Sequence, residues 1–180
     1  MRTQTLAAAV ALATLTLPLA ACSSTAPRDE VVVAAAAAPA GLDFTTTGGA
    51  AAPQALVGNV YETLVRIDAS GTPTPLLAES WDRDGGVFTF HLRDGVTFSN
   101  GKPFTADDAA FSINYVKDKW TNGLKAQMDP VTAVEALDPR TLRVTVGGDA
   151  AAQDAWLWSM GTLTGAMMTP DGVDDLATAP

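Results

Sequence analysis

Apolar and polar residues alternate over residues 87–93, as they do in a β-strand with one buried face. Phe88, Phe90 and Leu92 would face a core, and the residues between them would face water. Gly-Gly and Asp-Gly pairs on either side of this segment are typical of tight turns. The pattern therefore predicts a series of short strands, of which the others lie over residues 76–81, 96–98, 132–137 and 141–146.

Apolar residues spaced three or four positions apart predict helices over residues 52–67 and, more briefly, over 153–160. Another helix is predicted to begin after Thr105, because a hydroxyl residue is suited to the N-cap position. Asp107 and Asp108 would then lie in its first turn, where acidic charge suits the positive end of the helix dipole. Since neighbouring acids on a helix point to different faces, we interpret this pair as capping residues and not as a catalytic or metal-binding pair.

Residues 31–38 form a continuous apolar run, which suits a strand buried on both faces, as in an α/β sheet. An alanine-rich helix is the alternative, but Pro39 and Gly41 would cut it short. The loop that follows, over residues 43–49, holds three hydroxyls and two glycines. Open α/β sheets place ligand-binding loops at this end of a strand, although such a composition also occurs in plain loops.

The first 21 residues are predicted to be an export signal. Arg2 gives a positive start, residues 6–19 are uncharged and mostly apolar, and small residues precede Cys22. The run is shorter than the roughly 20 residues of a spanning helix, so a retained transmembrane anchor is the less favoured interpretation. The sequence around Cys22 resembles a bacterial lipobox, which implies an acylated cysteine, a lipidated tether over residues 22–30, and a place on the outer face of the cytoplasmic membrane.

Charge and residue usage exclude several classes of function. The net charge is -9, and the 11 basic residues are scattered, which argues against a nucleic-acid partner. The single histidine, His91, falls on the water-facing side of its strand, and Cys22 is the only cysteine, so neither a catalytic triad nor a zinc site is expected. A hydrolase that uses two of the 20 acidic residues remains an alternative, as does a scaffold or signalling lipoprotein.

Several motifs of the chain occur in an order that resembles one protein family. They are YETL at 61–64, Gly71, Pro75, LAESW at 77–81, FTFHLRDGVTF at 88–98 and NGKPFTADD at 100–108. This combination resembles the extracellular solute-binding proteins of ABC importers, family 5, the dipeptide, oligopeptide and nickel-binding type. The chain departs from the family pattern at Phe44, where proline is frequent, and at Ala109, where valine is usual.

The resemblance implies an α/β, periplasmic-binding-protein-like fold of class II, the peptide-binding type. It also implies that residues 31–180 are the N-terminal portion of a longer two-lobed protein, namely part of one lobe with a small α+β subdomain inserted at about 68–146. We therefore expect residues 23–180 alone to be marginally stable and to bind solute poorly. The implied function is non-catalytic: the protein binds peptides or similar small solutes and delivers them to the permease and ATPase subunits of an importer, without a cofactor.

The resemblance also indicates which segments would face the ligand, and these are not the motifs, which are structural. The candidate ligand-binding residues are Thr45, Thr46, Thr47, Gly48 and Gly49 after the first strand, Trp120 after the subdomain helix, and Gly161 and Thr162 where the chain returns to the lobe. We hypothesise that the hydroxyls of Thr46 and Thr47, or N–H groups beside them, line the cleft. No catalytic or metal-ligating residue is expected.

Overall fold

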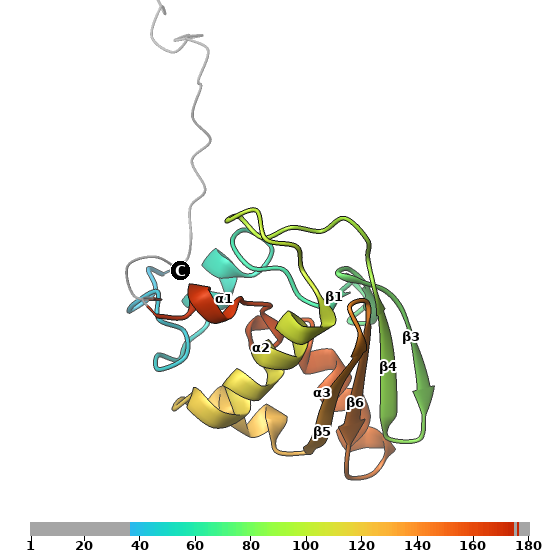
Figure 1. The fold of residues 1–180 in the computed structure, drawn as a ribbon. Helices are drawn as coiled ribbons and strands as arrows, with labels where there is room; N and C mark the ends of the chain where they lie inside the picture. The colour runs from blue at the N-terminus through green and yellow to red at the C-terminus, as the bar shows by residue number, and fades with distance from the viewer. Residues whose placement is uncertain (1–36, 175, 177–180) are drawn as a thin grey trace, which may run out of the picture. The chain divides into compact units, whose positions relative to one another are not determined.

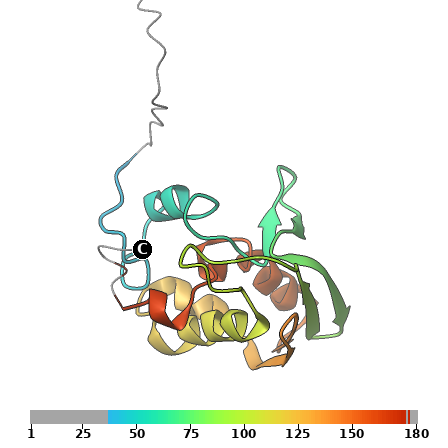
Figure 2. The ribbon, with the colours of Figure 1, turned by 45° about the horizontal axis from the view of Figure 1, so that its top comes forward.

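A four-stranded antiparallel sheet, with the spatial order β3-β4-β6-β5, is the centre of the computed structural model, which describes residues 37–174 and 176. In that order the strands are β3 (Ala78–Asp84), β4 (Val87–Leu92), β6 (Thr141–Val146) and β5 (Val131–Asp138). Two hairpins, 78–92 and 131–146, thus lie side by side, joined through the β4–β6 pairing. A separate small hairpin of β1 (Val65–Ile67) and β2 (Pro73–Pro75) has its tip projecting away from the helices (Figure 2).

Helices cover one face of this sheet (Figure 1). The α-helices of the described residues are α1 (Ala51–Leu56), α2 (Ala106–Lys119) and α3 (Ala150–Ser159). The described residues also form three short 3₁₀ helices: η1 (Gly123–Met128) between α2 and β5, and η2 (Leu163–Gly165) and η3 (Pro170–Gly172) after α3. The two longer helices, α2 and α3, pack on the same side of the sheet (Figures 1 and 2).

The alternation in β4 places its apolar residues in the core, as predicted. Phe88 and Phe90 are fully buried and pair across the sheet with Val144 and Leu142 of β6. The ring of Trp156, on α3, lies 5.1 Å from that of Phe88 and 6.2 Å from that of Phe90. Aromatic side chains from strand and helix therefore form the centre of the core.

The opposite face of the sheet is polar. Thr89, between Phe88 and Phe90, pairs with Arg143, which in turn pairs with Glu135 on β5. The Arg143 guanidinium lies 3.4 Å from the Glu135 carboxylate. His91 lies on this face too, with 40 % of its side chain exposed and its Nε2 3.0 Å from Asp82 Oδ2, which confirms that the lone histidine is a surface residue.

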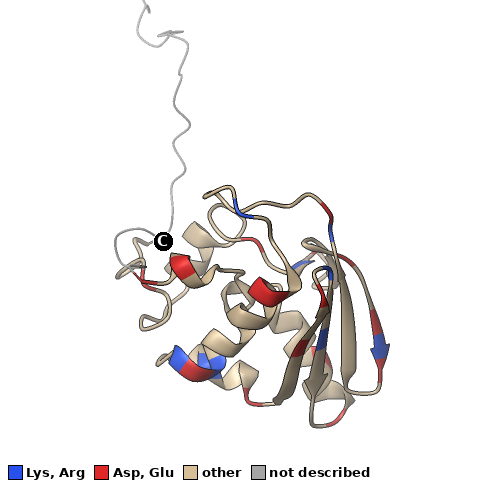
Figure 3. Cartoon of the chain, in the orientation of Figure 1, with Lys and Arg blue, Asp and Glu red and all other residues tan. Residues whose placement is uncertain are grey.

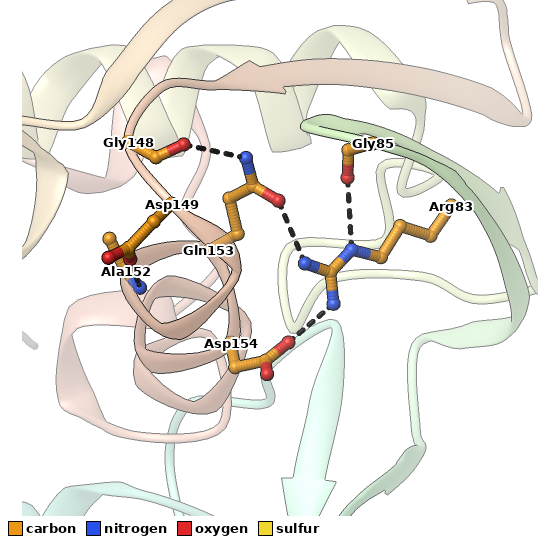
Figure 4. A network of polar contacts seen from close by, with 7 residues as sticks. All are labelled: Arg83, Gly85, Gly148, Asp149, Ala152, Gln153 and Asp154. Carbon is orange, nitrogen blue, oxygen red and sulfur yellow. Dashed lines mark hydrogen bonds and ion pairs between the residues drawn. The ribbon is translucent and has the colours of Figure 1, made fainter.

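Arg83, on the edge strand β3, fastens the first hairpin to α3 (Figure 4). Its guanidinium donates to the Asp154 carboxylate and, over 2.8 Å, to Gln153 Oε1, while its Nε donates to the carbonyl of Gly85 over 3.0 Å. The same guanidinium lies over the ring of Phe88, 5.1 Å from its centroid. This network orients α3 on the sheet with directional contacts that apolar packing does not supply.

The start of α2 follows the capping prediction. The carboxylate of Asp108 accepts a hydrogen bond from the backbone N–H of Thr105 over 3.0 Å and another from its hydroxyl over 2.7 Å. Acidic residues lie at the start of this helix, and Lys117 and Lys119 lie in its last turn (Figure 3). Both charge placements complement the helix dipole, so the Asp pair has the structural role that the sequence indicated.

Two predicted elements differ from the structure. The helix expected over residues 52–67 ends at Leu56, because Gly58 turns the chain at a φ of 77° and the residues after it pair with the segment around β2 instead. The strand expected over 96–98 is a single bridge between Thr97 and Pro103, within a loop closed by Phe98 N–H and the carbonyl of Lys102. Pro103 lacks an N–H, so it cannot extend that ladder. The strand predicted over 31–38 lies outside the described residues, except for its last two.

Candidate functional site

The loop after the predicted first strand is held together by Asp43. One carboxylate oxygen of Asp43 accepts from the N–H of Thr45 over 3.0 Å and from its hydroxyl over 2.6 Å, and the other accepts from the Thr46 hydroxyl over 3.0 Å. The Thr47 hydroxyl donates to the Asp43 carbonyl. Burial acts to raise the pKa of Asp43, but the hydrogen bonds from Thr45 and Thr46 outweigh it and leave the pKa below its ordinary value. All three threonine hydroxyls are therefore engaged within the loop.

Exposure differs along this loop. Thr45 is buried and Thr47 half-buried, whereas Thr46, Gly48 and Gly49 are exposed. Gly49 has a φ of 117°, a conformation that side-chain-bearing residues rarely adopt. Of the candidate residues in the loop, these three exposed ones are the most accessible to a ligand.

Phe44 anchors the loop in an aromatic cluster. Its ring is fully buried between those of Tyr61 and Trp120, whose centroids lie 5.0 and 5.4 Å away in edge-to-face arrangements. Trp120 is 1 % exposed, so the ring that was predicted to face a ligand lies in the core beneath the loop. Burial raises the pKa of Tyr61 to about 12, which leaves its hydroxyl protonated at neutral pH.

Asn122 connects this loop to the end of α2. Its side-chain amide donates to the carbonyl of Phe44 over 2.6 Å and to that of Thr47 over 3.1 Å. The backbone N–H of Thr121 donates to the carbonyl of Thr45 over 3.0 Å. The structure thus brings together two of the three segments that were expected to face a ligand, the loop at 45–49 and the chain that follows α2 from Trp120. Nothing in the sequence pointed to this contact of Asn122.

The third segment, after α3, is tightly packed. A methyl group on Gly161 would lie 2.7 Å from Cδ1 of Ile67, so the α-carbon of this glycine faces the β1 hairpin at close range. The Thr162 hydroxyl donates to the carbonyl of Ser159 over 2.7 Å. The Thr164 hydroxyl lies 2.5 Å from Gln127 Oε1 in η1, which joins this segment to the one that follows α2.

A cavity of about 370 Å³ lies elsewhere in the structure. It opens between residues 96–104, the segment at 60–62 and the chain at 167–172, and its lining includes Phe98, Phe104 and Met167. The candidate ligand residues are absent from its lining. The sequence did not predict this cavity, because its lining, which also includes Leu77, comes from four separate stretches of the chain.

Residues 37–174 and 176 contain no group of three or more His, Cys, Asp or Glu side chains that could hold a metal ion. No helix in this part of the chain is long and apolar enough to cross a membrane.

Sequence comparison finds the motifs of this chain in known proteins. The family of bacterial extracellular solute-binding proteins, family 5 Middle, matches residues 72–172, which is more than half of the chain. The nickel-binding periplasmic protein of Escherichia coli (strain K12) is 40% identical over 90 residues, covering 48% of this chain and 17% of that protein. The periplasmic oligopeptide-binding protein OppA of the same strain is 34% identical over 107 residues, covering 49% of this chain and 20% of that protein.

Structure comparison gives the same grouping. The periplasmic binding protein DppA of Helicobacter pylori, solved in complex with the peptide STSA, superposes with a TM-score of 0.63 at 27% identity. The match covers 79% of this chain and 33% of that one, which confirms the periplasmic-binding-protein-like fold class. In both comparisons the chain spans well under half the length of its relatives. Matched in sequence over residues 72–172 and in fold over most of its length, the chain belongs to the bacterial extracellular solute-binding proteins, family 5.

Proposed function

We propose that this chain forms part of the first lobe of a solute-binding protein that delivers peptides or similar small solutes to an ABC importer. The observation that carries the proposal is the family match over residues 72–172 together with the fixed loop at 43–47, which is held against the end of α2. Members of this family are binding proteins, and the OppA and DppA relatives bind peptides by name. The partners would be the permease and ATPase subunits of the importer.

The solute would meet the exposed part of the loop. Thr45 is buried and Thr47 half-buried, with both hydroxyls bonded to Asp43, so these two residues would shape the loop. The Thr46 hydroxyl is bonded to Asp43 as well, but Thr46 is exposed, as are Gly48 and Gly49, so these three residues would contact the solute. Glycines let a ligand approach the backbone closely, and backbone N–H and C=O groups match those of a peptide. Trp120 would support the loop from the core, where its ring packs on that of Phe44. Gly161 packs on Ile67 and Thr162 bonds to Ser159, and both would belong to the third segment of the site.

Binding by the complete protein tests this proposal, including any sequence that its gene encodes beyond these residues. We expect a mixture of tri- to pentapeptides to bind with one-to-one stoichiometry by native mass spectrometry, without cleavage. A Gly48→Val variant should bind at least about tenfold more weakly, because its side chain would hold a peptide off the backbone. Ala69→Val is the control, since it enlarges an exposed side chain in the turn between β1 and β2, away from the loop, and its effect should be small.

Two results would contradict the proposal. Peptide cleavage would favour the alternative of a secreted hydrolase that uses carboxylates. Unaltered peptide affinity in Gly48→Val would show that the loop is not part of the binding site.

We also propose that Cys22 is acylated and holds the protein at the outer face of the cytoplasmic membrane. Cys22 lies outside the described residues, and the proposal rests on its position directly after the apolar leader. Acyl chains bind a membrane by hydrocarbon burial alone, without a spanning helix.

Expression in a bacterial host with an alkyne-tagged palmitate tests the anchor. The natural chain should incorporate the label and enter the detergent phase on Triton X-114 partition, whereas Cys22→Ser should lose both properties. Ser23→Ala is the matched control and should behave like the natural chain. A Cys22→Ser variant that still enters the detergent phase would instead support a retained apolar anchor.

A further inference from the structure

We infer that Asn122 is the positioning residue of the solute site: its amide fixes the loop 43–47 in the orientation that presents Thr46, Gly48 and Gly49. This inference rests on the proposed function and deepens it. It assigns Asn122 a role that the sequence did not indicate, because the residues it contacts lie 75 and 78 positions away.

The hydrogen bonds of Asn122 show why it positions the loop and does not bind the ligand itself. Both N–H groups of the amide are engaged, one with the carbonyl of Phe44 and one with that of Thr47. The amide oxygen accepts from the N–H of Leu124 over 2.9 Å, at the start of η1. An amide offers two N–H groups and one oxygen, so its donors are fully used within the protein.

Three carbonyls of the loop point toward the same short segment. Those of Phe44 and Thr47 accept from the Asn122 side chain, and that of Thr45 accepts from the backbone N–H of Thr121. Because these bonds are directional, they determine how the loop is rotated about its own axis. The exposed residues Thr46, Gly48 and Gly49 are what this rotation leaves accessible.

The aromatic cluster of Phe44, Tyr61 and Trp120 could not fix the rotation of the loop by itself. Burial of Phe44 between Tyr61 and Trp120 holds the loop in place by apolar contact, which is non-directional and tolerates rotation. The two hydrogen bonds from the Asn122 amide restrict the attached loop to one orientation. A loop already ordered before the ligand arrives avoids part of the entropy cost of binding.

Asn122→Asp is the sharpest test because it keeps the shape of the side chain. One carboxylate oxygen can still accept from the N–H of Leu124, but the other would face the carbonyls of Phe44 and Thr47 in place of a donor. Asn122→Ala removes the contacts without adding repulsion and should act in the same direction, less strongly. Asn59→Asp is the matched control, since the Asn59 amide also donates to two carbonyls, Gln54 and Ala55, but only within its own turn.

The first measurement needs no ligand. Hydrogen–deuterium exchange in the complete protein should report on Thr45 and Thr47, whose N–H groups are bonded to Asp43. In Asn122→Asp, exchange over residues 43–50 should be about tenfold faster or more, while exchange over strands β4 and β6 stays as in the natural chain. Acceleration everywhere would mean general destabilisation and would overturn the positioning role, as would unchanged exchange over 43–50.

The second measurement is peptide affinity, with the mixture described above. Asn122→Asp should weaken binding about tenfold or more, and Asn59→Asp should not. Faster loop exchange with unaltered affinity would overturn the inference, because the loop would then not belong to the site. If the natural protein bound no peptide, the proposed function would fail, while the exchange result would still show whether Asn122 orients the loop.

Discussion

Phe90→Ala is expected to leave this chain largely unfolded. The Phe90 side chain is fully buried on a central strand and contacts the rings of Trp81, Phe88 and Trp156 at centroid distances of 6.2 to 6.3 Å. Truncating such a side chain costs about 3–5 kcal/mol, because the apolar surface loses its burial and the remaining cavity cannot collapse. That loss equals the whole stability only at the lower end of the range for domains, about 5–15 kcal/mol. It would unfold this chain because residues 23–180 alone are expected to be marginally stable.

Urea unfolding followed by far-ultraviolet circular dichroism measures this effect without depending on the nearby tryptophans. Phe111→Ala is the matched control: Phe111 is half-buried on α2 and its ring contacts that of Tyr115. The control should lose about 1 kcal/mol. Equal losses in the two variants would show that Phe90 is not at the centre of the core.

Gly165→Ala is expected to destabilise the chain by about 2–3 kcal/mol, although it adds a single methyl group. That methyl would lie 2.3 Å from the carbonyl oxygen of Met160 and 2.6 Å from its carbonyl carbon. Both atoms belong to the backbone, so relief requires the chain to move. The following residue, Ala166, bridges to Thr63, and such a movement would disturb that contact as well.

Thermal unfolding together with urea titration would measure the loss. Gly123→Ala is the matched control. The space around Gly123 is open, so the free energy of unfolding of this variant should change by less than about 0.5 kcal/mol. If Gly165→Ala were as stable as this control, Gly165 in η2 would not lie as close to the Met160 backbone as described.

The sequence was sufficient for elements whose pattern is local. The alternation in β4, the turn between β5 and β6, and the cap of α2 each depend on residues a few positions apart, and the structure has them where they were predicted. The same local reasoning failed at residues 52–67, where helical spacing predicted one long helix. There, pairing of Val65 with Pro75 in another segment outweighs the periodicity.

The candidate site was predicted less completely than the fold. The sequence selected three segments, and the structure joins the first to the second through Asn122 and the second to the third through Thr164 and Gln127. It could not indicate that Trp120 turns inward onto Phe44. A tryptophan after a helix suits a pocket wall and a core equally well, and the choice depends on what packs against it.

The sequence by itself determined the family and the hairpins of the subdomain, because turn residues and alternating patterns act over a few residues. Only the tertiary structure decided which loop residues are accessible and which amide orients them. Those properties depend on contacts such as that of Asn122 with Phe44, 78 positions apart, which arise when the core has packed. No local pattern in the sequence predicts such a contact, because directional hydrogen bonds between distant residues form only when folding has brought them together.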